Sequence, residues 1–138
     1  MPANPENPNS AKIHNKTEGE NPLQHVLKAS SYSLAGLWAT LKHELAFRIE
    51  AALTVLLLPV ILFLPIGLMF KAMVIGSMLL VLTVELLNSA LEWTVDYISL
   101  DKHPYAKLAK DMGSAAVMMA LINSGVFWLL AILEWLEF

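Results

Sequence analysis

The sequence contains no cysteine, and only 15% of its 138 residues are charged. The absence of cysteine excludes disulfide bonds and thiol chemistry. The chain also contains no GxxxxGK[ST] loop, no GxGxxG turn, no HExxH helix and no Cys/His cluster of the zinc-binding kind. Any nucleotide site in this chain must therefore be an unconventional one.

Hydrophobic residues are abundant instead: they make up 57% of the chain, and the mean hydropathy is +0.57. Three apolar stretches, over residues 51–70, 72–93 and 113–136, each come close to the ~20 residues that a helix needs to cross a bilayer. We therefore predict an all-α integral membrane bundle with three spanning helices. Pro59 and Pro65 should kink or fray the outer end of the first one.

Positive charge is unevenly distributed between these stretches. Five of the nine lysines and arginines precede the first stretch, and Lys102, Lys107 and Lys110 lie between the second and the third. Only Lys71 separates the first two, and none follows the third. By the positive-inside rule, the N-terminus and the 101–111 loop should be cytoplasmic. Because the first apolar run starts only at residue 51, we expect no cleavable signal peptide and a first helix that stays as an anchor.

The segment before the first span divides into two parts. Residues 1–22 are rich in Pro, Asn and Glu, a composition typical of a disordered tail. From Leu23 to Glu50, apolar residues recur every three or four positions with cations between them. This pattern predicts an amphipathic helix on the membrane surface, or two short ones broken near Ser30–Ser33. Residues 23–138 should form one membrane-embedded domain.

Polar side chains interrupt the second apolar stretch in a regular way. Glu85, Asn88 and Glu92 share one helical face, because 3.6 residues per turn returns i+7 to almost the same angle; Ser89 and Asp96 extend that face. One acid at a helix centre costs ~2.5–3.5 kcal/mol on a translocon scale. Two acids in one span therefore indicate buried partners, a metal ion or catalysis. A polar clamp between helices, a cation or proton channel and a purely structural subunit are the alternatives.

The charged groups near the predicted cytoplasmic interface together suit one kind of chemistry. Carboxylates and amides are hard oxygen ligands of the kind that Mg²⁺ takes, and lysines can neutralise phosphate. A carboxylate can also accept the proton of an alcohol. These groups favour phosphoryl transfer from a nucleotide to a lipid alcohol. Simpler roles are also open: Glu44 could pair with Arg48, Asp111 could cap the third helix, and Lys110 could snorkel.

Three segments resemble the small prokaryotic diacylglycerol kinase family: FRIE at 47–50, VELLNSALEWTVD at 84–96 and HPYAKLAKDMGSAAV at 103–117. The resemblance extends over about residues 23–136. It implies a homotrimer in the bacterial inner membrane, with composite active sites between protomers and no nucleic-acid partner. It also implies transfer of the γ-phosphate of magnesium-ATP to diacylglycerol, which yields phosphatidic acid and ADP.

The resemblance further assigns roles by position. Glu85 matches the general base and Asn88 the amide beside it, while Glu44 and Glu92 match the carboxylates that hold Mg²⁺ against the nucleotide. The positions that match nucleotide contacts are His25, Tyr32, Glu44, Glu92, Asp96, Asp101, Lys102, His103, Lys110 and Asp111. Those that match contacts to the lipid substrate are His25, Ala29, Ser30, Ser31, Ser33, Leu34, Glu85 and Ser114.

Two positions depart from the family pattern. His25 stands where the best-known members have an arginine, so its contact should be weaker or dependent on pH. Leu108 replaces an arginine found in some members just before the AKD motif. Within the family, an undecaprenol kinase is the rival to a diacylglycerol kinase. The NSA between the acids and the DMGSA after Lys110 are more similar to the diacylglycerol enzymes.

Overall fold

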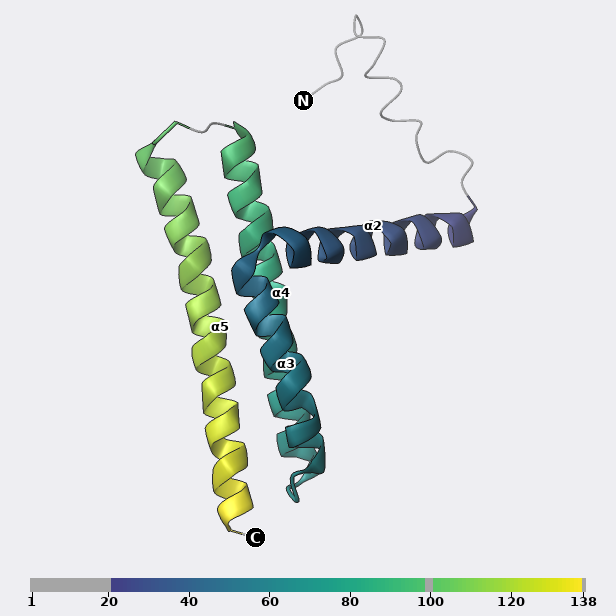
Figure 1. Ribbon diagram of the computed structural model, residues 1–138, viewed down its shortest axis with the longest axis vertical. Helices are drawn as coiled ribbons and strands as arrows, with labels where there is room; N and C mark the ends of the chain where they lie inside the picture. The colour runs from purple at the N-terminus through teal and green to yellow at the C-terminus, as the bar shows by residue number, and fades with distance from the viewer. Residues whose placement is uncertain (1–20, 99–100, 138) are drawn as a thin grey trace, which may run out of the picture. The chain divides into compact units, whose positions relative to one another are not determined.

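The computed structural model describes residues 21–98 and 101–137. Within these residues the chain forms four helices: α2 (Pro22–His43), α3 (Leu45–Phe63), α4 (Leu68–Ile98) and α5 (Pro104–Leu136) (Figure 1). The helices α3, α4 and α5 are each long and apolar enough to cross a membrane. The predicted all-α class with three spanning helices is confirmed. The predicted tail falls almost entirely on residues 1–20, outside the described residues.

The chain divides into two compact units, residues 1–36 and residues 37–138. In the first unit, the described residues form the N-terminal part of α2. This helix runs without a break through Ser30–Ser33, so the alternative of two short helices broken there is wrong. The hydroxyl groups of these serines donate to backbone carbonyls three or four residues earlier, which satisfies them within the helix.

The break between α2 and α3 lies at Glu44 instead. Its backbone is extended, with φ −103° and ψ 116°, and α3 begins at the next residue. The first span therefore starts six residues before the apolar stretch that predicted it. At the other end, α3 stops at Phe63, just before Pro65, while Pro59 lies inside the helix.

The helices α4 and α5 also extend beyond their apolar stretches, and both do so toward the loop that joins them. The second stretch reaches position 93 but α4 continues to Ile98, and α5 begins at Pro104, nine residues before the third stretch. Hydropathy marks only the part of a helix that suits lipid, whereas backbone hydrogen bonding continues into the polar segments. The charged residues at this end consequently stand on helices.

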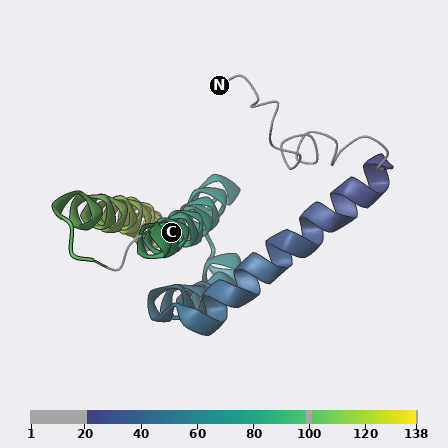
Figure 2. The same cartoon turned by 90° about the horizontal axis from the view of Figure 1, so that it is seen from above.

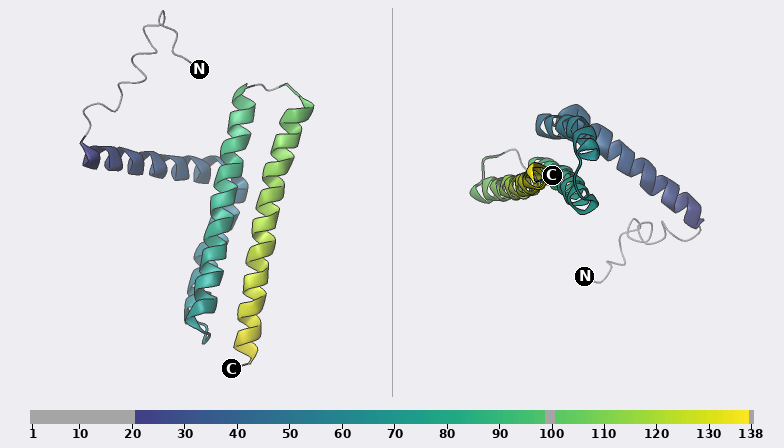
Figure 3. Two further views of the ribbon diagram at one scale, coloured as in Figure 1. Left: turned by 180° about the vertical axis from the view of Figure 1, so that it is seen from behind. Right: turned by 90° about the horizontal axis from the view of Figure 1, so that it is seen from below.

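In the second unit, α4 packs against both α3 and α5 (Figures 2 and 3). A buried apolar cluster joins the three helices in the half nearer the α3–α4 connection. Its members are Ile61, Ile66, Val74, Met78 and Ala131. Along α4 the buried stripe continues from this cluster through Val81 to Glu85 and Ser89, so that it becomes polar toward the α4–α5 loop.

Two close contacts set the register of α4 against α5. The Ser77 hydroxyl lies 3.2 Å from that of Ser124, and both side chains are buried. Gly113 lies against the side chain of Asn88 so closely that a Cβ atom there would collide with the amide. The two contacts are 11 residues apart along each helix, which is three helical turns. The missing side chain of Gly113 lets α5 approach α4 closely at this point.

Candidate active site

Glu85 is the most deeply buried acid on α4, with 5% of its surface exposed. Its side chain thus points into the bundle and away from lipid. The carboxylates of Glu92 and Glu44 lie close enough to Glu85 to repel its negative charge. Glu85 acts in the same way on Glu50 of α3, whose Oε2 is buried with no hydrogen-bond partner among the described residues. We call Glu44, Glu50, Glu85 and Glu92 the glutamate cluster.

Glu44 enters this cluster from the break between α2 and α3. Its side chain does not cap α3. Its Oε1 instead accepts a hydrogen bond of 2.6 Å from the indole Nε1 of Trp93 on α4. The ring of His43 meets the same indole edge-on, with 5.8 Å between ring centroids. The carboxylate is therefore directed across the bundle toward α4, and not along α3 toward Arg48.

Asn88 lies between the glutamate cluster and α5. Its Nδ2 donates to Glu92 Oε1 at 3.2 Å. Its Oδ1 is buried against Gly113 and accepts no hydrogen bond from the described residues. The amide is thereby oriented, with its nitrogen on a carboxylate and its oxygen left as an unsatisfied acceptor.

This contact makes Gly113→Ala a sharp local probe. The added methyl group cannot fit unless the Asn88 amide moves, and we expect this movement to disturb the hydrogen bond from the amide to Glu92. We expect the variant to keep its three spanning helices. We also expect kcat for the reaction at this site to fall at least ~10-fold, because a small misplacement of a side chain in an active site can cost up to ~100-fold in rate. Gly125→Ala is the matched control, since a Cβ there meets open space. Equal rates for both variants would contradict a role for the Asn88 amide.

The fit of these residues to a metal ion can be judged from their donor atoms. No three His, Asp or Glu side chains in residues 21–98 and 101–137 converge as a ready-made metal site. Mg²⁺, however, usually binds through one or two carboxylates and completes its shell with phosphate and water. Glu44 and Glu92 both lie near Glu85. Two carboxylates fit the donor set of a magnesium ion that shares its shell with a nucleotide.

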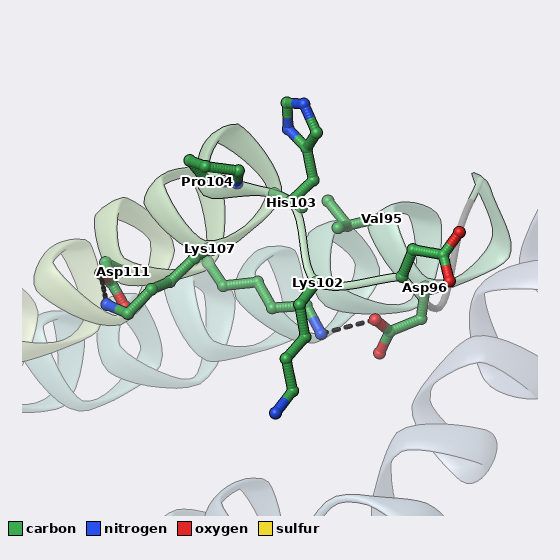
Figure 4. Close-up of a pocket in the computed structure, with 10 residues that line it drawn as sticks. Val95, Asp96, Lys102, His103, Pro104, Lys107 and Asp111 are labelled. Carbon is green, nitrogen blue, oxygen red and sulfur yellow. Dashed lines mark hydrogen bonds and ion pairs between the residues drawn. The ribbon is translucent and has the colours of Figure 1, made fainter.

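A pocket of about 620 Å³ opens where α4 and α5 approach their connecting loop (Figure 4). It is lined mainly by charged residues: Asp96, Asp101, Lys102, His103, Lys107, Lys110 and Asp111. We call it the lysine pocket. Lys110 Nζ reaches across from α5 to Asp96 Oδ1 of α4 at 2.6 Å, and Lys107 pairs with Asp111 one turn along α5 (Figure 4).

One of the simpler roles open to these charges is wrong. Asp111 cannot cap α5, because the helix starts two turns earlier, at Pro104. Its cap is His103, whose Nδ1 accepts a hydrogen bond from the Tyr105 backbone N–H at 3.2 Å. Lys110 binds Asp96, and its snorkelling role stays a prediction. The lysine pocket does gather six of the predicted nucleotide contacts: Asp96, Asp101, Lys102, His103, Lys110 and Asp111.

The predicted contacts in the first unit lie on α2, where His25, Tyr32 and the residues from Ala29 to Leu34 are all exposed. Ser114 is exposed on α5, one residue after Gly113. The functions of these residues remain predictions.

Three side chains at the site were not among the predicted site residues. Glu50 directly precedes the first apolar stretch and ends the FRIE segment, so the sequence did offer a signal for it. Lys107 belongs to the basic 101–111 loop, whose positive charge is visible in the sequence. Trp93 carries no comparable signal, because its partner Glu44 is 49 residues away in the sequence.

The fold and the site define a helical membrane protein in which the glutamate cluster around the buried Glu85 and the lysine pocket both lie along the half of α4 nearer the α4–α5 loop. The chain belongs to the prokaryotic diacylglycerol kinase family, whose model matches residues 31–132. It is thus an enzyme of that family, and the resemblance carried by the three sequence segments is confirmed.

Individual relatives match over most of their length. A diacylglycerol kinase of Pseudomonas aeruginosa is 48% identical over 111 residues, which cover 80% of this chain and 90% of the relative. The diacylglycerol kinase of Haemophilus influenzae is 42% identical over 82% of this chain and 93% of its own length. That of Escherichia coli K12 is 39% identical over 90% of this chain and 98% of its own.

Proposed function

We propose that this protein transfers the γ-phosphate of ATP to the free hydroxyl of diacylglycerol, which yields phosphatidic acid and ADP. The observation that carries the proposal is the buried Glu85 among three further glutamates, in the half of α4 that also borders the lysine pocket. Relatives named diacylglycerol kinase, at 39–48% identity, support the lipid substrate.

In the proposed reaction, Glu85 is the general base. The lipid oxygen forms a bond to the γ-phosphorus as the bond from that phosphorus to the β–γ bridging oxygen breaks. The proton of the hydroxyl passes to the Glu85 carboxylate, and ADP leaves. The low exposure of Glu85 supports this role, because a base shielded from water is not held by a hydration shell.

Glu44 and Glu92 are the proposed ligands of Mg²⁺, and Asn88 holds Glu92 in place through its amide nitrogen. The bound ion would supply positive charge for the phosphates during transfer. One oxygen of Glu92 accepts a hydrogen bond from Asn88, and one oxygen of Glu44 accepts a hydrogen bond from Trp93. These bonds support a role as metal ligands, because they restrict the orientation of the second oxygen of each carboxylate.

We place the nucleotide phosphates near the lysine pocket. The pairs Lys110–Asp96 and Lys107–Asp111 are at least one-third exposed, and pairs of this kind contribute only ~0.2–1 kcal/mol each. Their lysines can therefore exchange an aspartate for a phosphate at little cost. The other proposed nucleotide contacts are His25, Tyr32, Asp101, Lys102, His103 and Asp111.

The acceptor would reach the site from the bilayer, with His25, Ser114 and the α2 segment from Ala29 to Leu34 as proposed lipid contacts. Large apolar side chains are exposed along α3, α4 and α5, as expected for helices that face lipid or other protomers. We further propose a homotrimer in the bacterial inner membrane, with the N-terminus and the 101–111 loop in the cytoplasm. The distribution of lysine and arginine supports this orientation.

The experiment that tests the function offers two lipids side by side. Purified protein in mixed micelles receives labelled ATP, Mg²⁺ and equal amounts of diacylglycerol and undecaprenol, and the labelled lipids are separated. We expect labelled phosphatidic acid as the main product. Labelled undecaprenyl phosphate alone would overturn the acceptor, and the absence of any labelled lipid would overturn the kinase.

A further inference from the structure

We propose that Trp93 is a positioning residue that aims the Glu44 carboxylate at the magnesium–nucleotide complex. This inference rests on the proposed function. Its basis is the hydrogen bond of 2.6 Å from the Trp93 indole Nε1 to Glu44 Oε1, which joins α4 to the break between α2 and α3.

Glu44 needs an external partner to hold one orientation. It lies in extended backbone between two helices and makes no hydrogen bond to the free N–H groups at the start of α3. A glutamate side chain loses up to ~2 kcal/mol of rotamer entropy when it is fixed. A short hydrogen bond from a rigid ring supplies the restraint that the local backbone does not.

Packing within this chain does not account for the orientation of Trp93, because the residue is 58% exposed. The indole contacts His43 edge-on, and His43 is the residue directly before Glu44. The ring is therefore held by the neighbour of the very carboxylate to which it donates.

The chemistry of the indole suits this task. Its N–H is a donor only and carries no charge, so it occupies one carboxylate oxygen without neutralising Glu44. A lysine in the same place would compete with the cation. Groups that hydrogen-bond a metal-ligating carboxylate typically contribute 10- to 100-fold to metal affinity.

The test is Trp93→Phe, which keeps an aromatic ring against His43 and removes the N–H. Binding of Mn²⁺ together with a non-hydrolysable ATP analogue is measured by electron paramagnetic resonance on the full-length protein in micelles. We expect the dissociation constant for Mn²⁺ to rise ~10-fold. Trp135→Phe, near the far end of α5, is the matched control and should leave it unchanged. Unchanged Mn²⁺ affinity in Trp93→Phe would overturn the inference.

Two further measurements test whether Trp93 acts through Glu44, and a third outcome bears on the proposed function alone. In a Glu44→Gln background, Trp93→Phe should add no further loss of Mn²⁺ affinity, and additive losses would contradict action through Glu44. In wild-type protein, the indole N–H resonance of Trp93 should shift when Mg²⁺ and the analogue are added. This measurement needs only wild-type protein, so it applies even if Trp93→Phe does not assemble. A Trp93 resonance that does not shift would overturn the inference. Wild-type protein that binds Mn²⁺ but phosphorylates no lipid would instead overturn the proposed function.

Discussion

Replacement of Glu85 by glutamine should lower kcat for diacylglycerol phosphorylation by ~10²- to 10⁴-fold, the usual contribution of a general base. Glutamine has the shape of glutamate, but its amide cannot take the proton of the lipid hydroxyl. Initial rates in mixed micelles, at saturating ATP and diacylglycerol, measure the effect.

The fold should survive this substitution. Glu85 is buried near the carboxylates of Glu44, Glu50 and Glu92, and a neutral amide removes their mutual repulsion. We therefore expect the thermal unfolding temperature and the oligomeric state to be at least maintained. The loss of rate can then be attributed to chemistry and not to misfolding.

Glu137→Gln is the matched control, because it makes the same chemical change on an exposed residue at the C-terminal cap of α5. It should turn over at the wild-type rate. A near-wild-type rate for Glu85→Gln would remove Glu85 from the role of base. If Glu50→Gln were then inactive, the base would be the neighbouring glutamate of α3.

Glu44→Gln and Glu92→Gln should each raise the magnesium concentration needed for half-maximal rate by at least ~10-fold and also lower the maximal rate. Each change removes one negative charge from the proposed metal ligands. The hydrogen bonds from Trp93 and Asn88 will hold the new amides by their oxygens, because both partners are donors. The NH₂ group is then the part left to face the cation, and it cannot bind it.

A magnesium titration at constant ATP measures this effect, with free Mg²⁺ corrected for the nucleotide complex. Glu134→Gln serves as the control, since it lies in the last turns of α5, far along the helix from the lysine pocket. Unchanged magnesium dependence in both site variants would contradict their role as ligands. A change in only one of them would leave a single protein carboxylate on the ion, a number that Mg²⁺ also accepts.

Local pattern was sufficient for much of this protein. Three apolar runs predicted three spanning helices, because ~20 apolar residues are what a bilayer core demands. The spacing of Glu85, Asn88 and Glu92 placed them on one face of α4, because helical geometry repeats regardless of the surroundings. The structure confirms the helix and turns Glu85 inward. The roles of these residues remain predictions until the variants are measured.

Contacts between segments that are distant in the sequence could not be predicted from local sequence patterns. Nothing in the sequence pairs Glu44 with Trp93, or Asn88 with Gly113, because such contacts depend on how the helices are rotated and offset against one another. The break between α2 and α3 was equally hidden, since the apolar period continues past Glu44.

The sequence by itself determined which residues can lie in lipid, which acids share a helical face, and the family to which the chain belongs. Only the tertiary structure decided that α2 ends at His43, that Glu50 joins the glutamate cluster, and that the Trp93 indole holds the Glu44 carboxylate. The physical reason is that helix periodicity is a local property of the backbone, whereas the offset of α3 and α5 against α4 comes from side-chain packing at contacts such as Gly113 and Ser77.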